Sequence, residues 1–118
     1  MVSCNYTDQK QIGKNYFIRS INSKEFIDIG YGEENFSEGF IPNTVFEVLW
    51  NEKYILVKRH PINQSNLVDF FIIKKVKDDI RLASKNRIGP LSKENYKKTI
   101  NQLNIKENTL NKVVYNSW

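Results

Sequence analysis

The single histidine, His60, is the first place in this sequence where catalytic chemistry could be found. Any nucleophilic site that pairs a serine or a cysteine with histidine would have to use it. The single cysteine, Cys4, lies at the start of the chain, and no Gly-x-Ser-x-Gly elbow is present. We therefore expect no catalytic residues, and we interpret the run Lys58-Arg59-His60 as the end of a β-strand.

The acidic residues do not indicate a catalytic or metal-binding site either. The adjacent pairs Glu33-Glu34 and Asp78-Asp79 fall in stretches rich in turn-forming residues, where acids are usually solvated. One cysteine and one histidine cannot form a Cys/His metal site, and neither a Walker loop nor a dinucleotide glycine fingerprint is present. We expect no metal, no cofactor and no enzyme activity. A hydrogen bond from His60 to an acid such as Asp28 or Asp69 would reopen the question of activity.

Charge is distributed unevenly along the chain. Residues 1–50 carry four Lys and Arg against seven Asp and Glu, a net charge of −3, and residues 51–118 carry fourteen against six, a net charge of +8. Such an asymmetry can orient an encounter with a membrane or a charged partner, unless the fold mixes the two halves over one surface. The total of +5 does not by itself indicate nucleic acid, because arginine, which binds phosphates and bases bidentately, occurs only four times.

Cys4 stands in a context typical of lipid attachment. Met-Val-Ser-Cys, followed by a polar run, is similar to the cleavage end of a bacterial lipoprotein precursor whose apolar segment has been removed. We predict Cys4 as a lipid-attachment residue within a flexible N-terminal segment, residues 1–14. A chance cysteine in a disordered tail is the open alternative. No stretch of the sequence approaches the roughly 18 apolar residues that a membrane-spanning helix requires.

Short runs of alternating apolar and polar residues predict antiparallel strands through the first two thirds of the chain. The predicted strands cover residues 15–22, 24–32, 45–50, 54–60, 68–77 and 80–84, and residues 33–43 form an acidic loop. Residues 51–53 connect a β-hairpin, whose second strand ends before Pro61. Strict alternation within 45–50 places Phe46 and Glu47 on opposite faces.

A helical period replaces this alternation after Gly89-Pro90, which we interpret as a turn. Ser92 is a good N-cap for a helix near residues 92–103. Apolar residues on its inner face are Leu91, Tyr96, Ile100 and Leu103, and Lys93, Lys97 and Lys98 would face water. The apolar group 113–115 in the tail closes the sheet or docks on the helix.

These features predict an α+β fold in a single β-rich domain, residues 15–118. It would contain an antiparallel sheet or small barrel of five to six strands with one C-terminal helix packed on it. The runs NYFIRSI, YILVKRHP, DFFIIKK and RIGPLSKENYKKTINQLNI resemble a family of short, uncharacterised bacterial lipoproteins with a β-rich body, a GPL turn and a C-terminal helix. The resemblance covers residues 15–105. It implies an envelope location and a lipid on Cys4, and it implies no activity.

The leading functional hypothesis is a non-enzymatic protein of the cell envelope or extracellular space that binds another macromolecule, either a protein or an envelope component. The alternative is a cytoplasmic inhibitor or immunity-type protein that caps a partner protein. Candidate partner-binding residues are Phe36 and Phe40, as apolar anchors in the acidic loop, and Arg59 and His60 at the end of the hairpin.

Nucleic acid is not expected as a partner, although aromatic residues and cations lie on neighbouring predicted strands. Aromatic side chains of a small sheet normally fill its core. The alternation that exposes Lys58 places Arg59 on the other face, so these two cations cannot share one patch with Lys74 and Lys75.

Overall fold

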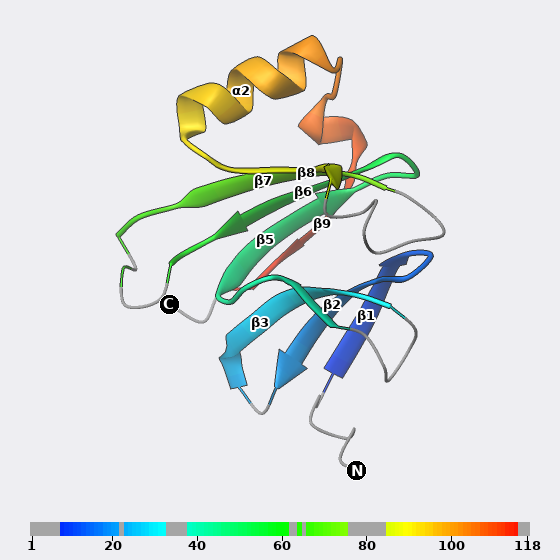
Figure 1. Ribbon diagram of the computed structural model, residues 1–118, viewed down its shortest axis with the longest axis vertical. Coiled ribbons are helices and arrows are strands. Elements are labelled where there is room, and N and C mark those ends of the chain that lie inside the picture. Colours follow the sequence, from blue (N-terminus) through cyan, green and yellow to red (C-terminus); the bar gives the residue numbers. More distant parts are fainter. Residues whose placement is uncertain are drawn as a thin grey trace.

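The computed structural model describes residues 8–21, 23–32, 38–61, 64, 66–75 and 85–115. These residues form two antiparallel sheets and one α-helix, arranged in three layers (Figure 1). A five-stranded sheet is the middle layer, with a four-stranded sheet on one face and the helix α2 on the other. The predicted β-rich body with one C-terminal helix is therefore confirmed. The prediction of a single sheet or barrel of five to six strands is wrong, because the described part of the chain already contains nine strands, divided between two open sheets.

The four-stranded sheet has the order β1-β2-β3-β4. Its strands are β1 (Asp8–Gly13), β2 (Tyr16–Ile21), β3 (Ser23–Tyr31) and β4 (Glu38–Ile41). Strand β1 lies within the segment 1–14 that we expected to be flexible, and it pairs with β2 along its length. Ile12 is the apolar residue that β1 buries in the core. One such residue in a polar hexapeptide is too weak a signal to predict a strand.

The five-stranded sheet has the order β8-β7-β6-β5-β9. Its strands are β5 (Val45–Trp50), β6 (Tyr54–Arg59), β7 (Asp69–Lys74), β8 (Arg87–Leu91) and β9 (Asn111–Val114). The predicted β5–β6 hairpin is confirmed, and Asn51 closes it by accepting hydrogen bonds at Oδ1 from the backbone N–H groups of Lys53 and Tyr54, both at 2.8 Å. Strand β9 pairs with β5, so the tail closes the sheet. The predicted strand at 80–84 lies outside the described residues.

Gly89 and Pro90 lie in the edge strand β8 rather than in a turn. An edge strand tolerates proline because one of its sides makes no ladder hydrogen bonds. Gly89 has a φ of 134°, and a Cβ atom there would lie 2.7 Å from the carbonyl oxygen of Phe70. Only glycine satisfies both the dihedral angle and this close approach of β8 to β7.

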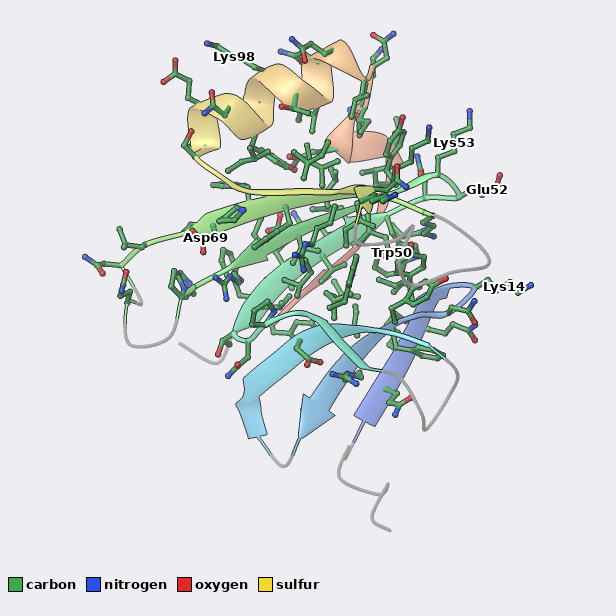
Figure 2. The ribbon with its side chains drawn as sticks, in the orientation of Figure 1. Lys14, Trp50, Glu52, Lys53, Asp69 and Lys98 are labelled. Atoms are coloured by element: carbon green, nitrogen blue, oxygen red, sulfur yellow. The ribbon has the colours of Figure 1, made fainter. Side chains whose placement is uncertain are left out.

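The helix α2 (Lys93–Gln102) begins at the predicted N-cap, where Ser92 Oγ accepts a hydrogen bond from the backbone N–H of Asn95 at 3.2 Å. Tyr96 and Ile100 are buried beneath it, and its lysines are exposed, as predicted. Lys98 projects from the outer surface of α2 (Figure 2). A 3₁₀ helix, η2 (Glu107–Thr109), connects α2 to β9.

The two halves of the sequence, which differ in charge, occupy different layers. Strands β1 to β4 come from the acidic half, whereas β6 to β9 and α2 come from the basic half. Only β5 belongs to the first half and lies in the second layer. The secondary structure elements are therefore segregated by layer rather than mixed over one surface (Figure 1).

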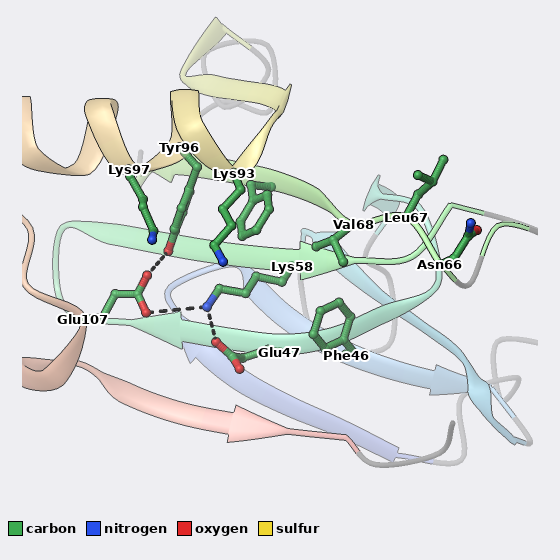
Figure 3. A pocket seen from close by; sticks show the side chains of 11 residues that line it. Phe46, Glu47, Lys58, Asn66, Leu67, Val68, Lys93, Tyr96, Lys97 and Glu107 are labelled. Carbon is green, nitrogen blue, oxygen red and sulfur yellow. Dashed lines mark hydrogen bonds and ion pairs between the residues drawn. The ribbon is translucent and has the colours of Figure 1, made fainter.

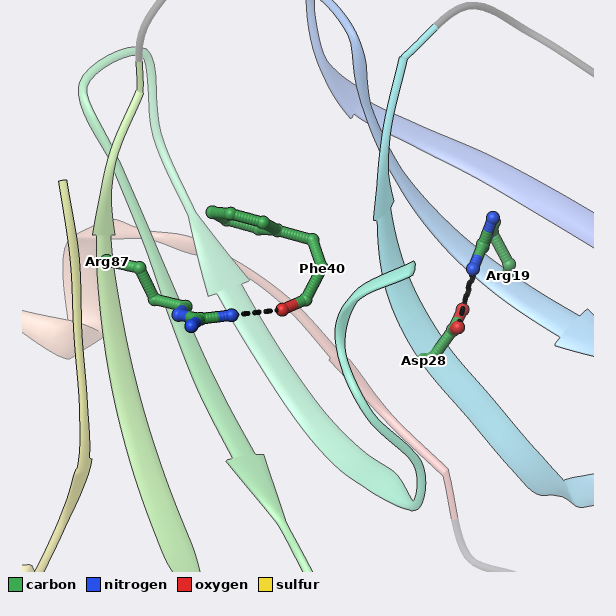
Figure 4. A network of polar contacts seen from close by, with 4 residues as sticks. All are labelled: Arg19, Asp28, Phe40 and Arg87. Atoms are coloured by element: carbon green, nitrogen blue, oxygen red, sulfur yellow. Dashed lines mark hydrogen bonds and ion pairs between the residues drawn. The ribbon is translucent and has the colours of Figure 1, made fainter. Parts of the chain in front are cut away.

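Polar contacts reinforce the sheets and the junction between them. Arg19, which is 3% exposed, donates from Nε and Nη2 to the two carboxylate oxygens of Asp28 at 2.8 and 2.6 Å and so joins β2 to β3 (Figure 4). Arg87 donates from Nη1 to the carbonyl oxygen of Phe40 at 2.6 Å, which links β8 to β4 (Figure 4).

Lys75 also connects separate segments, because it donates from Nζ to the carbonyl oxygens of Ile12 and Asn51. Burial lowers the pKa of Lys75, and the nearby charge of Glu52 partly opposes that shift.

The substitution Asp28→Ala should lower the free energy of unfolding by about 3 kcal/mol, because it removes the carboxylate that holds the buried Arg19 guanidinium. Urea denaturation measures the change. Glu94→Ala is the matched control, since it breaks the exposed Glu94–Lys98 pair at 3.8 Å. That change should lower the free energy of unfolding by less than about 0.5 kcal/mol. Equal losses in the two variants would contradict this account of the buried pair.

Candidate functional site

The structure describes three of the five predicted site residues. Cys4 and Phe36 lie outside the described residues. Phe40 is 5% exposed and packs in the core between the sheets, where its ring centroid lies 6.3 Å from that of Tyr16 and 6.2 Å from that of Tyr31. The end of the acidic loop forms strand β4, which turns Phe40 inward, so its side chain is not available as a surface anchor.

Arg59 is occupied by contacts within the protein. Its Nη2 atom donates to Asp69 Oδ2 at 2.9 Å, and its Nη1 atom donates to the carbonyl oxygen of Asn43 at 3.3 Å. The guanidinium carbon lies 5.4 Å from the ring centroid of Phe71. Lys58 faces α2 and Arg59 faces the other side of the sheet, as the alternation predicted.

His60 lies at the end of β6, beside the loop that leads to β7. Its Nδ1 atom is 2.7 Å from the carbonyl oxygen of Leu67, a contact in which Nδ1–H donates, and its ring stacks on Phe46 with centroids 4.4 Å apart. The acids considered as its partners, Asp28 and Asp69, each accept a hydrogen bond from an arginine. His60 therefore has a structural role, and its two contacts, Phe46 and Leu67, line a neighbouring cleft.

The cleft has a volume of about 560 Å³ and opens between α2 and the five-stranded sheet (Figure 3). Pockets for small molecules usually enclose roughly 300–1,000 Å³. Its walls come from β5, β6, the start of β7, residues 66–68, α2 and η2. Segments far apart in the sequence thus meet at one opening.

A β-bulge in β5 shapes one wall of the cleft. The register between β5 and β6 shifts between Val45 and Glu47, which leaves Phe46 as the extra residue. As a result Phe46 and Glu47 both line the cleft, and Val45 joins Val48 in the core between the sheets. The prediction that Phe46 and Glu47 lie on opposite faces is wrong, because the bulge interrupts the alternation.

A network of charged and polar groups forms the floor of the cleft (Figure 3). Lys58 Nζ lies 2.6 Å from Glu47 Oε2 and 3.5 Å from Glu107 Oε1. The hydroxyl of Tyr96 donates to Glu107 Oε2 at 2.6 Å. The Lys58 ammonium also lies 6.0 Å from the ring centroid of Phe70 and 5.8 Å from that of Tyr96. The network joins β5, β6, α2 and η2, so it fixes the helix and the following segment on the sheet.

The rim of the cleft is more exposed than its floor. Lys93 and Lys97 are exposed on α2 and line the opening. Leu67 and Val68 lie across from them, with 49% and 36% of their surface exposed. The sequence predicted correctly that the two lysines are exposed, but it did not show that they border a cleft. No sequence signal indicated that residues 66–68 would lie opposite α2, because that proximity depends on the pairing of β6 with β7.

Among the described residues, no helix combines the length and the apolar composition that a membrane-spanning segment requires. No group of three His, Cys, Asp or Glu side chains in that part of the chain is placed to hold a metal ion.

Comparison with known proteins identifies one family. The sequence model described as "Protein of unknown function (DUF3997)" matches residues 13–114, a span that contains β2 to β9 and every residue that lines the cleft. No match was found among curated proteins or among solved structures.

Tyr96 should resist deprotonation in alkaline solution. Burial raises its pKa above the ordinary value of 10.0, and the hydrogen bond to Glu107 and the charges of Glu107 and Glu47 raise it further. Because the pKa is higher in the folded state, this contribution to stability is complete below pH 10 and is lost as the pH rises towards the folded-state value. The variant Tyr96→Phe should therefore lose less unfolding free energy between about pH 9 and pH 11 than the native protein.

An ultraviolet titration of tyrosinate in the folded protein gives a second measurement. The variant Tyr96→Phe should leave the titration near pH 10 unchanged, since the native Tyr96 is still protonated there. Glu107→Gln removes a negative charge and should move the Tyr96 titration to lower pH. Loss of a titration step near pH 10 in Tyr96→Phe would contradict the raised pKa.

Proposed function

The chain belongs to DUF3997, a family of unknown function, and we propose that it is a non-enzymatic binding module of the bacterial cell envelope whose cleft engages a partner protein. The cleft carries this proposal. It combines a rigid floor with two exposed aliphatic side chains, Leu67 and Val68, at its mouth. Apolar groups that remain exposed beside a cleft and are surrounded by polar residues are typical of surfaces that bind another molecule.

The contacts of the titratable groups favour binding over catalysis. Glu47 and Glu107 both contact Lys58, and Glu107 also accepts a hydrogen bond from Tyr96. A general base or nucleophile needs a free proton-accepting position aimed at a substrate. In this cleft the carboxylates instead stabilise the partly buried Lys58 ammonium, which is a structural role.

An envelope location rests on the Cys4 context and agrees with the geometry of the fold. Strand β1 begins at Asp8, four positions after Cys4, at the end of the molecule opposite α2 (Figure 1). A lipid on Cys4 would hold the four-stranded sheet towards the membrane. The cleft beneath α2 would then face away from the lipid and remain accessible to a partner. The alternative of a cytoplasmic inhibitor loses one of its two proposed anchors, because Phe40 is buried.

Replacing Cys4 by serine should release the protein from membranes. The test requires expression from the native gene with its own upstream sequence, followed by membrane fractionation and labelling with an alkyne fatty acid. The native protein should sediment with membranes and take up the label, and Cys4→Ser should do neither, because attached acyl chains supply the apolar attachment. A reading frame without an apolar segment upstream of Met1 would contradict lipid attachment.

A photo-crosslinking residue at position 67 should give a discrete adduct with a partner protein in the native host. The same residue at Glu52, which is exposed at the tip of the β5–β6 hairpin and does not line the cleft, is the matched control and should give none. Partner proteins bury a compact surface, so only positions within that surface should react. Adducts at both positions, or at neither, would contradict the cleft as the binding site.

A further inference from the structure

The two ends of the cleft differ in chemistry. Lys93 and Lys97 direct their ammonium groups into one end, near Tyr96 (Figure 3). Val68 lies towards the other end, near Phe46, and Leu67 lies beyond Val68 at the mouth of the cleft (Figure 3). A ligand that fills the cleft would therefore meet cations at one end and apolar side chains at the other.

The two rim lysines, Lys93 and Lys97, form no ion pair with any described residue. Three ammonium groups line the cleft against two carboxylates, and both carboxylates contact Lys58. Within the described residues, no acid lies within ion-pair distance of Lys93 or Lys97. Lys98 differs, because it pairs with Glu94 one turn earlier on the same helix. The cleft therefore has a positive charge that the fold leaves available.

The positions of these lysines are locally unfavourable. Lys93 and Lys97 lie four residues apart on one face of α2, a spacing at which like charges repel. Lys93 is also the first residue of the helix, where the helix dipole disfavours a cation. An anion bound between the two ammonium groups would relieve both effects. We therefore expect the partner to present a negatively charged group to these two lysines.

The apolar end of the cleft indicates that the ligand carries an apolar group next to its negative charge. Leu67 is 49% exposed and Val68 is 36% exposed, and Phe46 is half-buried beside them. Removal of this apolar surface from water would stabilise a complex. A simple anion such as acetate would leave this surface exposed. A long acyl chain would extend beyond this apolar surface and meet the charged side chains of Glu47 and Lys58 on the floor of the cleft.

We propose that the cleft recognises an acidic peptide segment of the partner protein, in which a carboxylate side chain adjoins an aromatic or branched apolar side chain. This inference rests on the proposed binding function and adds the chemistry of the partner. The carboxylate lies between Lys93 and Lys97, and the apolar side chain packs on Phe46, Leu67 and Val68. Complementary charge provides orientation, and the apolar contact provides much of the affinity.

A blocked synthetic pentapeptide, Ser-Glu-Phe-Glu-Ser, tests this chemistry in the absence of a known partner. Binding to the ¹⁵N-labelled protein is followed through amide chemical shifts. The peptide should shift the amides of Val68 and Lys97, with an affinity that falls as salt rises from about 20 mM to about 300 mM. Replacement of both glutamates by glutamine, or of the phenylalanine by alanine, should weaken binding about tenfold or more.

Variants of two neighbouring lysines provide the matched comparison. Lys97→Gln should weaken binding of the acidic peptide about fivefold, whereas Lys98→Gln, on the outer surface of α2, should leave it unchanged. The amide spectra of the free variants show whether each remains folded. Equal losses in both variants, or equal binding of the glutamine peptide, would overturn the proposal.

Other ligands are tested in the same experiment. Tighter binding of decanoate or of a short single-stranded oligonucleotide than of the acidic peptide would overturn the peptide assignment. The outcome is separable from that of the binding function itself. If a crosslinked adduct forms at position 67 but the acidic peptide changes no amide chemical shift, only the acidic-peptide proposal is refuted. If no adduct forms at position 67, the cleft is refuted as the binding site.

Discussion

Burial of strand β6 on both of its faces is the constraint on which the three-layer arrangement depends. Ile55 and Val57 fill the core between the two sheets, and Leu56 belongs to the core beneath α2. Each of these side chains is fully buried, which stabilises the fold by about 1.5–3 kcal/mol per residue. A strand that is apolar on both faces needs a covering layer on each side. The four-stranded sheet and the helix supply those two layers.

The charged end of β6 extends the same constraint into the cleft. Lys58 continues the face that α2 covers, and Arg59 continues the face that meets the other sheet. Burying a cation is unfavourable unless an acid accompanies it. Arg59 therefore contacts Asp69, and Lys58 contacts Glu47 and Glu107. The Lys58–Glu107 contact draws η2 against the sheet, so the electrostatics of one strand end also position the segment that leads into β9.

The parts of the fold that follow from local pattern could be predicted from the sequence. The β5–β6 hairpin, the helix with its Ser92 cap and the opposite directions of Lys58 and Arg59 depend on residues close together in the chain. The division into two sheets could not be predicted, because a period of two residues shows which side chains share a face and not which layer covers that face.

The cleft could not be predicted either, for a related reason. The bulge at Phe46 depends on how β5 pairs with β6, and a single-residue shift of register reverses the faces that follow. The approach of Leu67 and Val68 to the mouth of the cleft depends on the pairing of β6 with β7. The candidate residues predicted from the sequence therefore lay on the hairpin end and in the acidic loop. Of those that the structure describes, His60 contacts two residues that line the cleft, Phe46 and Leu67.

The floor and the rim of the cleft have different physical explanations. The floor charges contribute to stability, since each carboxylate contacts the partly buried ammonium group of Lys58. The same reasoning does not account for Lys93 and Lys97, which repel each other, or for Leu67 and Val68, whose apolar surface stays in water. Sequences that fold well usually satisfy local preferences, and departures from them concentrate at functional sites. Four such departures border one opening here, and an acidic, apolar ligand would satisfy all four together.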